Sequence, residues 1–389
     1  MTRIAGAQRE LRIALAGGGT GGHIVPGLHL LAGVEEDCAR PVDVVWFTSG
    51  RAVEDRVLGA AREQLAATPF ERVVLPIEPK GGGAPSRAGL VLRTPSAVLR
   101  ARERLIAHRS DVVVGLGGFT SLPVVLAARS LKIPVVLLEV NAHRGEATRW
   151  LARFAARILH ASRATLPDGE DRVNRFVGPP LAPFFAAHAA LDESARERAA
   201  QTARRELGLD PKRPLLVVLG GSQGSSALNA FVREHLVSFL ASGLQVVHQT
   251  GPNKIREAGP ECSGYRAQEY VEDVPRALTA ATIALVRGGA STLAEVAALR
   301  VPALVAPYPG HADKHQEKNA AQLGAGVLIV QDSELNAHAR DEILALSRAT
   351  GSNRLRSMRT ALAAAVPTDS TRRIWREILA AKLERENTK

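Results

Sequence analysis

The sequence predicts an α/β protein with two halves, each built around a parallel sheet. Two observations predict this class. Short apolar runs alternate with helical patterns along the 389 residues, as expected for strands joined by crossover helices. A strand followed at once by a glycine-rich loop and a helix occurs near the N-terminus and again after residue 213. This repeat indicates two Rossmann-like domains that face one cleft.

The first half opens with an apolar run, Leu11–Ala16, which leads into the glycine loop Gly17–His23. A helix is expected over Pro26–Val34, with Pro26 in its first turn. Three further strands are predicted at Asp43–Phe47, Asp111–Gly118 and Ile133–Leu138, and a helix at Ala147–Ala161. The proline-rich segment Val177–Pro183 then interrupts the pattern. We therefore place the domains at residues 1–180 and 181–368.

The second half repeats this order. Its elements are a strand at Pro214–Leu219, the glycine loop Gly220–Ser226, a strand at Leu244–His248 and a short helix at Asp273–Ala280. Next come a strand at Thr282–Val286, a turn at Arg287–Gly289, a helix at Ala290–Leu299 and a strand at Val301–Ala306. Residues 369–389 form a final amphipathic helix, for which we expect a return to the first domain.

Composition narrows the possible partners. The formal net charge is +11, which favours anionic partners. Only 4% of residues are aromatic, so the stacking platforms of nucleic-acid binders are sparse and no nucleic-acid partner is expected. The sequence has no 18-residue apolar run for a membrane span. Its two cysteines are far apart, which predicts no disulfide framework or metal site and fits a reducing cytoplasm.

The turn after Val286 is suited to a phosphate. Ser291 and Thr292 lie where a helix begins, with unpaired backbone N–H groups and the positive end of the helix dipole. Glu295, one turn further on, offers two acceptor oxygens to a vicinal diol such as ribose. Gln316 and Asn319 are placed to reach further hydroxyls. The alternative is structural, because Thr292 and Glu295 also have the spacing of a capping box.

The first glycine loop contains the pattern G-x-G-x-x-G at Gly17, Gly19 and Gly22. A dinucleotide site would need an acidic residue at the end of the second strand. That strand ends in Thr48–Gly50, without an acid, which argues against NAD. His23, at the mouth of the loop, could accept a proton near neutral pH. Its alternative role is a hydrogen bond to backbone at a helix start.

The chain lacks a phosphate loop of the G-x-x-x-x-G-K-[ST] type and lacks an Asp-x-Asp pair. A nucleotide is therefore expected to be held by helix ends, backbone amides and Arg287, without a metal ion. The segment Lys80–Arg109 mixes apolar residues with arginines. This pattern suits docking on an anionic membrane surface, and equally a core helix with a solvated arginine face.

Four ordered motifs carry a family resemblance that runs from about Leu11 to Gln331. They are Gly17–Gly27, Gly115–Pro123, Gly220–Gly224 and Arg287–Asn319. The chain resembles the peptidoglycan N-acetylglucosaminyltransferases of glycosyltransferase family 28, which have the GT-B fold. The resemblance implies an inverting transfer of N-acetylglucosamine from UDP-GlcNAc to undecaprenyl-diphospho-N-acetylmuramoyl-pentapeptide (lipid I). It also implies a peripheral protein on the cytoplasmic face of the cell membrane, within a cell-wall synthesis complex.

The resemblance assigns roles to named residues. His23 is implied as the base that deprotonates the acceptor hydroxyl. Donor binding is implied for Thr20, Gly21, Gly22, Asn141, Ser222, Val271, Ala290, Ser291, Thr292, Leu293, Ala294, Glu295, Gln316 and Asn319. Within this set, the N-terminal residues would face the transferred sugar and the diphosphate, and Glu295 would hold the ribose. No metal or other cofactor is expected.

The chain departs from the family at two places. Leu138 and Val140 stand where the family has polar residues, and Ala182 stands where it has a donor-site arginine. Arg175 and Arg287 are the candidates to replace that arginine. Two alternatives follow: a related transferase that uses a UDP-sugar on another lipid acceptor, and a non-catalytic subunit that binds a UDP-sugar.

Overall fold

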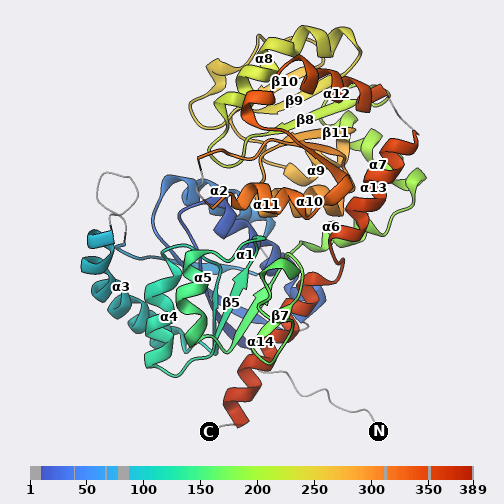
Figure 1. Ribbon diagram of the computed structural model, residues 1–389. Coiled ribbons are helices and arrows are strands. Elements are labelled where there is room, and N and C mark those ends of the chain that lie inside the picture. The colour runs from blue at the N-terminus through green and yellow to red at the C-terminus, as the bar shows by residue number, and fades with distance from the viewer. Residues whose placement is uncertain are drawn as a thin grey trace, which may run out of the picture. The chain divides into compact units, whose positions relative to one another are not determined.

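The computed structural model describes residues 10–38, 40–65, 68–77, 87–310, 313–348 and 352–387. The chain forms two compact units (Figure 1). The first comprises Met1–Pro183 with Asp369–Lys389, and the second comprises Phe184–Thr368. Each unit has its own parallel sheet and its own core, so the predicted α/β class with two Rossmann-like domains is confirmed.

The first unit is built on a seven-stranded parallel sheet of order β3-β2-β1-β4-β5-β6-β7. Its strands are β1 (Leu11–Ala16), β2 (Val42–Thr48), β3 (Phe70–Val74), β4 (Val112–Gly115), β5 (Val135–Glu139), β6 (Arg157–His160) and β7 (Asn174–Phe176). Its helices are α1 (Gly21–Ala32), α2 (Ala52–Gln64), α3 (Arg87–His108), α4 (Ser121–Ser130), α5 (Glu146–Leu151) and α14 (Ser370–Asn387). The central strands are buried along their length, as parallel strands covered on both faces must be.

The second unit has a six-stranded parallel sheet of order β10-β9-β8-β11-β12-β13. Its strands are β8 (Leu215–Leu219), β9 (Gln245–Gln249), β10 (Tyr265–Gln268), β11 (Ile283–Val286), β12 (Ala303–Val305) and β13 (Val327–Ile329). Its helices are α6 (Pro183–Ala189), α7 (Glu193–Glu206), α8 (Ser226–Ala241), α9 (Val274–Ala280), α10 (Ala290–Ala298), α11 (His315–Ala321), α12 (Ala337–Arg348) and α13 (Asn353–Ala365).

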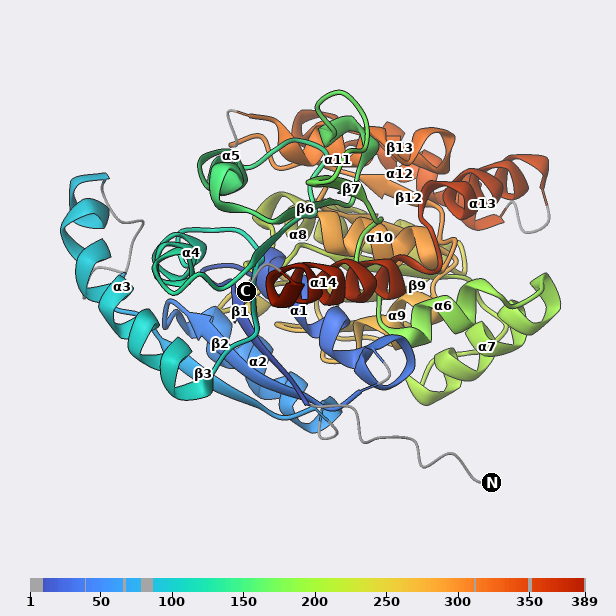
Figure 2. The same ribbon diagram turned by 90° about the horizontal axis from the view of Figure 1, so that it is seen from below.

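The C-terminal helix α14 belongs to the first unit, although the second unit separates it from the rest in sequence. It packs on α1 and beside β4, β5 and β6 (Figures 1 and 2). Trp375 is fully buried, and its indole N–H donates to the Leu30 carbonyl of α1 (3.1 Å). Glu377 accepts from the Arg157 guanidinium on β6 (3.3 Å). Apolar burial and a buried ion pair thus hold the helix in place.

Two predicted helices of the first half were wrong in their bounds. The helix expected at Pro26 begins at Gly21, directly after the extended Thr20, so Pro26 lies inside it. The helix expected over Ala147–Ala161 ends at Leu151, and β6 follows. The residues of β6 pair with β5 and are buried in the sheet. Pairing with a neighbouring strand overrides the local helical pattern there.

Candidate functional site

Both sheets reverse their strand order at one point, and the glycine loops follow the strands at that point. In the first unit the reversal lies between β1 and β4, and in the second between β8 and β11. The loops after β1, β4, β8 and β11 begin at Gly17, Leu116, Gly220 and Arg287. Ligands of open α/β sheets bind outside the carboxyl ends of the strands at such a switch point. The topology therefore groups the predicted residues into one set per unit.

His23 lies in the first turn of α1, and its ring is oriented by the loop that precedes it. Its Nδ1 donates to the Gly18 carbonyl (3.1 Å) and lies 3.3 Å from the Thr20 hydroxyl. A carbonyl oxygen can only accept, so Nδ1 carries a proton, and in the neutral ring the lone pair is then on Nε2. The backbone bond that was the alternative role for His23 is therefore present, and it leaves the ring in the tautomer of a general base.

The loop after β4 packs on the same imidazole. Gly117 and Gly118 have φ angles of +98° and +73°, which end β4 earlier than the sequence predicted. A Cβ on Gly118 would lie 2.9 Å from His23 Nδ1, and one on Gly117 would lie 3.0 Å from His23 Cδ2. Both positions need glycine, because the backbone conformation and the contact with the ring each exclude a side chain.

The start of α1 also presents backbone donors. Thr20 is the N-cap residue and is exposed. Gly21 and Gly22 are the first two residues of the helix, and N–H groups at these positions have no partner within a helix. The predicted residues Thr20, Gly21 and Gly22 therefore adjoin His23 at a positive helix end, which suits a negatively charged group.

Asn141 follows β5 at the same edge of the first sheet. Its backbone N–H and its Nδ2 both donate to the buried carboxylate of Glu139 (3.1 and 3.3 Å). Glu139 also accepts from the Gly145 N–H (2.8 Å) and so braces the whole turn. Leu138, one of the departures from the family, is buried in the sheet.

Glu54 is a residue of the first unit that the sequence analysis missed. It lies on α2, six residues beyond the end of β2. The dinucleotide pattern places its acidic residue at the end of that strand, so it did not point to Glu54. Burial raises the pKa of Glu54, but hydrogen bonds from Ser49, Gly19 and Gly50 outweigh it and hold the pKa below its ordinary value. Its position at N3 of a helix that follows a Ser-Gly turn was the available signal.

In the second unit, Arg287 ties three segments of the site together. Its side chain is 9% exposed. One nitrogen donates to the Ser225 hydroxyl at the start of α8 (2.6 Å), and another donates to the Ala306 carbonyl beyond β12 (2.9 Å). The guanidinium also forms an ion pair with Asp332. Arg287 therefore shapes the loops around the candidate site instead of offering its donors to a nucleotide.

Arg175, the other candidate to replace the missing arginine, donates one N–H, from Nε, to Glu377 of α14 (3.3 Å).

Helix α10 begins earlier than the capping-box alternative requires. Its N-cap is Gly289, so Ala290, Ser291 and Thr292 are its first three residues, and Thr292 and Glu295 both lie within it. A capping box at these two residues is thus excluded. The first three N–H groups lack helical partners, and the buried Ser291 hydroxyl has no hydrogen-bond partner among the described residues. Donor groups therefore gather at this helix start.

The remaining predicted donor-binding residues of α10 differ in whether their side chains have polar atoms for a ligand. Leu293 and Ala294 have buried side chains, and the Leu293 N–H donates to the Gly289 carbonyl within the helix (3.0 Å). Glu295 is 6% exposed. Leu293 and Ala294 therefore pack the helix on the core, and the polar atoms for a ligand come from the first turn and from Glu295.

Gln316 and Asn319 lie on α11 and hold the turn before α10. Gln316 Oε1 accepts from the N–H groups of Gly288 (3.1 Å) and Tyr308 (2.9 Å). Asn319 is buried, and its Nδ2 donates to the Gly288 carbonyl (3.0 Å). With the Gln316 oxygen used within the protein, the group that Gln316 can offer to a sugar hydroxyl is its amide NH₂.

Gln249 is a second residue that the sequence analysis missed. It ends β9, and its buried amide bridges two predicted donor-site segments. Nε2 donates to the Gly221 carbonyl next to Ser222 (2.9 Å), and Oε1 accepts from the Val271 N–H (3.2 Å). Val271 therefore keeps only its carbonyl for a ligand. A polar residue at the carboxyl end of a buried strand was the signal for Gln249.

A buried histidine lies behind these loops. His248 Nε2 donates to Asn229 Oδ1, and its Nδ1 accepts from the Tyr265 hydroxyl, both at 2.9 Å. Asn229 Nδ2 in turn donates to the Thr250 carbonyl (3.0 Å), next to the contact between Gly224 and Gly251. Burial lowers the pKa of His248 to about 4, although the nearby Glu257 opposes this shift.

This pKa predicts acid sensitivity of the second unit. The unfolded chain binds a proton near pH 6.5 and the folded chain only near pH 4, so the free energy of unfolding falls as the pH drops through that window. We expect a loss of about 3 kcal/mol from this residue. Urea denaturation of the wild type and His248→Gln, followed by far-UV circular dichroism from pH 7 to pH 4, measures it. If the free energy of unfolding changed with pH in the same way in both proteins, the predicted role of His248 would be contradicted.

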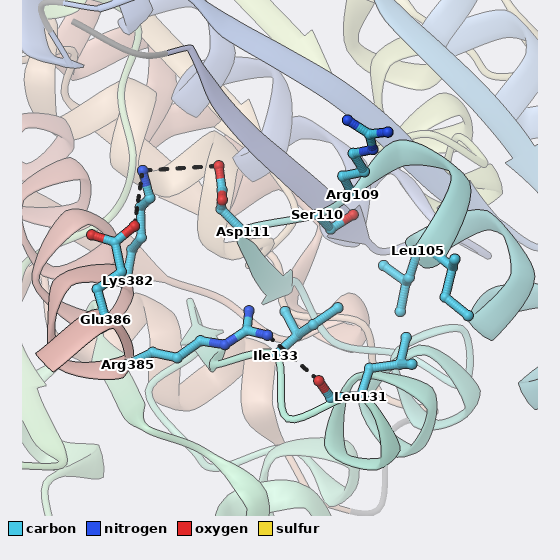
Figure 3. Close-up of a pocket in the computed structure, with 10 residues that line it drawn as sticks. Leu105, Arg109, Ser110, Asp111, Leu131, Ile133, Lys382, Arg385 and Glu386 are labelled. Carbon is cyan, nitrogen blue, oxygen red and sulfur yellow. Dashed lines mark hydrogen bonds and ion pairs between the residues drawn. The ribbon is translucent and has the colours of Figure 1, made fainter. Parts of the chain in front are cut away.

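A pocket of about 320 Å³ lies at the opposite edge of the first sheet (Figure 3). Ser110 and Asp111, just before β4, line it together with Lys382, Arg385 and Glu386 of α14. Lys382 Nζ lies 3.9 Å from Asp111 and 3.8 Å from Glu386. Because Lys382 pairs with Asp111 across the pocket and Arg385 of α14 donates to the Leu131 carbonyl (3.5 Å), we assign the pocket to the anchoring of α14 (Figure 3).

Helix α3 covers residues 87–108 of the predicted membrane-docking segment, while residues 80–86 lie outside the described residues. Ala97, Ala101 and Leu105 are buried in the core. Leu99 and Ile106 are 62% and 50% exposed. Across the described residues, no helix is long and apolar enough to cross a bilayer, and no group of three His, Cys, Asp or Glu side chains could hold a metal.

Comparisons with known proteins agree with this arrangement. Residues 13–160 match the model of the glycosyltransferase family 28 N-terminal domain, and residues 215–364 match that of the C-terminal domain. A protein of Paenarthrobacter aurescens (strain TC1) is 37% identical over 351 residues, which cover 88% of this chain and 89% of the relative. A protein of Cutibacterium acnes (strain DSM 16379 / KPA171202) is 36% identical and covers 82% and 84%.

Both of these proteins are named UDP-N-acetylglucosamine--N-acetylmuramyl-(pentapeptide) pyrophosphoryl-undecaprenol N-acetylglucosamine transferase. Among solved structures, the crystal structure of Acinetobacter baumannii MurG matches with a TM-score of 0.65 and 25% identity. The match covers 96% of this chain and 99% of that one.

Proposed function

The chain belongs to glycosyltransferase family 28, and from this premise we propose that it moves N-acetylglucosamine from UDP-GlcNAc to undecaprenyl-diphospho-N-acetylmuramoyl-pentapeptide. The single observation that carries the proposal is the 37% identity over 88% of the chain to a relative named for this reaction. The site agrees with it, because an oriented histidine in one unit and a donor-rich helix start in the other supply a base and an anion seat.

The reaction requires one proton transfer and one displacement. His23 Nε2 takes the proton from a hydroxyl of the muramyl sugar, and the hydroxyl oxygen attacks the anomeric carbon of GlcNAc. The bond from that carbon to the diphosphate oxygen breaks, and UDP leaves with the bonding electrons. The free N–H groups at the start of α10 would stabilise the leaving diphosphate, and Glu295 would bind the ribose hydroxyls.

Two further parts of the proposal concern cofactors and location. The helix-end donors take the place that a metal ion holds in other nucleotide-sugar enzymes, so we expect transfer without a metal. The exposed Leu99 and Ile106 on α3, beside the exposed Arg100 and Arg102, suit a peripheral protein on the anionic cytoplasmic face of the cell membrane. Sedimentation with anionic vesicles tests this part, as does pull-down for a cell-wall synthesis complex.

The test of the proposed function is release of UDP from UDP-GlcNAc in EDTA, with and without a lipid I analogue. Release that depends on the analogue supports metal-independent transfer to this acceptor. Release only with another lipid acceptor would replace the acceptor in the proposal. Donor binding without release on any acceptor would leave the non-catalytic alternative.

Gln316→Glu separates donor recognition from loop structure. A glutamate can still accept from the N–H groups of Gly288 and Tyr308, but it lacks the NH₂ group that Gln316 offers to a sugar hydroxyl. We expect the KM for UDP-GlcNAc to rise about 10-fold or more, since a hydrogen bond of this kind contributes roughly 1–2 kcal/mol. Steady-state kinetics measure this, and free UDP should bind as before. An unchanged KM would remove Gln316 from sugar recognition.

A further inference from the structure

Glu54 is fully buried, and both of its carboxylate oxygens are occupied. Oε1 accepts from the Gly19 N–H (2.6 Å), the Ser49 N–H (3.0 Å) and the Ser49 hydroxyl (2.6 Å). Oε2 accepts from the Gly50 N–H (2.6 Å), the Arg51 N–H (3.2 Å) and Arg72 Nη2 (3.0 Å). Five of these six donors belong to the turn between β2 and α2 or to β3, and the sixth belongs to the glycine loop after β1.

The glycine loop is held by this turn from two sides. The Gly19 N–H donates to Glu54, and the Gly19 carbonyl accepts from Arg51 Nη1 (3.2 Å). Gly19 has φ +86°, a conformation that glycine adopts without a steric penalty. A Cβ on Gly18 would lie 2.4 Å from Glu54 Oε1. The loop backbone therefore rests directly on the carboxylate.

The same two glycines determine the state of His23. The Gly18 carbonyl accepts from His23 Nδ1 (3.1 Å). The position of that carbonyl follows from the position of Gly19, the next residue, which Glu54 and Arg51 hold. A continuous line of contacts thus runs from the buried carboxylate through two backbone residues to the imidazole ring.

We propose that Glu54 is a positioning residue for the transfer: it holds Gly18 and Gly19 so that the proton stays on His23 Nδ1 and the lone pair stays on Nε2. Only the kinetic consequence rests on the proposed function, and the histidine tautomer does not. Groups that orient a histidine from behind are known to change the activity of the site they support.

The test compares Glu54→Gln with Asp55→Asn in the full chain. Glutamine replaces one acceptor oxygen with an NH₂ group that would face N–H donors. Asp55 is the matched control, because it is the adjacent acid on α2, is 64% exposed and pairs with the same Arg72. For Glu54→Gln we expect kcat to fall about 10-fold or more, while the KM for UDP-GlcNAc changes less than about 3-fold. Asp55→Asn should match the wild type.

The second readout is the His23 tautomer, from the ring ¹⁵N chemical shifts of histidine-labelled protein, with the signal assigned by His23→Asn. We expect the Nδ1–H form in the wild type and in Asp55→Asn, and loss of that form in Glu54→Gln. A folded Glu54→Gln protein that keeps both the wild-type kcat and the Nδ1–H form would overturn the inference. A fall in kcat with an unchanged tautomer would overturn it as well.

Two possible outcomes, a variant that does not fold and a wild type without transferase activity, require further measurements. If Glu54→Gln does not fold, Glu54→Asp serves in its place, because the side chain that is one methylene shorter keeps the negative charge but withdraws the carboxylate from the Gly19 N–H. A wild-type tautomer and kcat in Glu54→Asp would then overturn the inference. If the wild type transfers no sugar, the proposed function fails, and the tautomer comparison still decides whether Glu54 positions His23.

Discussion

His23→Ala is expected to lower kcat by about 100-fold or more, because a positioned general base contributes about 10²–10⁴-fold to such a step. The Nδ1 proton of His23 is committed to the Gly18 carbonyl (3.1 Å), which places the lone pair on Nε2. Alanine removes the base but leaves Gly18 and the loop backbone in place. Single-turnover transfer of radiolabelled GlcNAc measures the rate of the chemical step.

Donor binding separates a base from a residue that only binds. We expect the Kd for UDP-GlcNAc, measured by calorimetry, to change less than about 2-fold in His23→Ala, since His23 is assigned to the acceptor hydroxyl and most of the donor-binding residues belong to the second unit. His338→Ala is the matched control, because His338 is exposed on α12 of the second unit. A wild-type rate in His23→Ala would remove His23 from the mechanism, and an equal loss of donor binding would make it a binding residue.

Arg287→Met is expected to destabilise the second unit by about 3 kcal/mol or more and to weaken UDP binding at least 10-fold. Removing one partner of a buried ion pair costs about 3–5 kcal/mol, because the other charge is left unpaired. Arg287 and Asp332 are 9% and 25% exposed. The loss of the Ser225 and Ala306 contacts releases the loop after β8 and the end of β12, which border the helix start assigned to the diphosphate.

The measurement must report on the second unit. All three tryptophans, Trp46, Trp150 and Trp375, belong to the first unit, so their fluorescence does not. Hydrogen exchange of peptides from residues 184–368 does, with calorimetry for UDP affinity. Arg354→Met is the matched control, since it breaks the more exposed pair with Glu342 in the same unit and should cost less than about 1 kcal/mol. Equal protection in the two variants would contradict the role of Arg287.

Much of the architecture could be predicted from local pattern. The buried strands β1, β8 and β11 were predicted within one residue of their observed ends, because a short apolar run before a glycine turn has few other structures available. The strand β6 was missed, since its alanine-rich surroundings also fit a helix. Only its pairing with β5, which a local pattern does not contain, makes Arg157–His160 a strand.

For the candidate site, local pattern likewise identified residues but not their hydrogen-bond partners. His23 and Ser291 could be named because they follow glycine turns, and Gln316 could be named because it lies in the polar stretch after a predicted strand. Their states could not: the capping-box alternative at Thr292 ended only when the structure placed the N-cap at Gly289. Gln316 could be assigned an NH₂ donor only once its oxygen was seen to accept from Gly288 and Tyr308.

The sequence by itself determined the alternation of strands, glycine loops and helices along the chain, and the residue types those loops carry. Tertiary structure decided how those residues are held. Glu54 meets Gly19 across 35 residues, and Arg287 meets Asp332 across 45. A buried charge is stable only where donors or acceptors from other segments surround it. Those partners are brought together by the fold, so the tautomer of His23 and the commitment of Arg287 depend on contacts that no local pattern records.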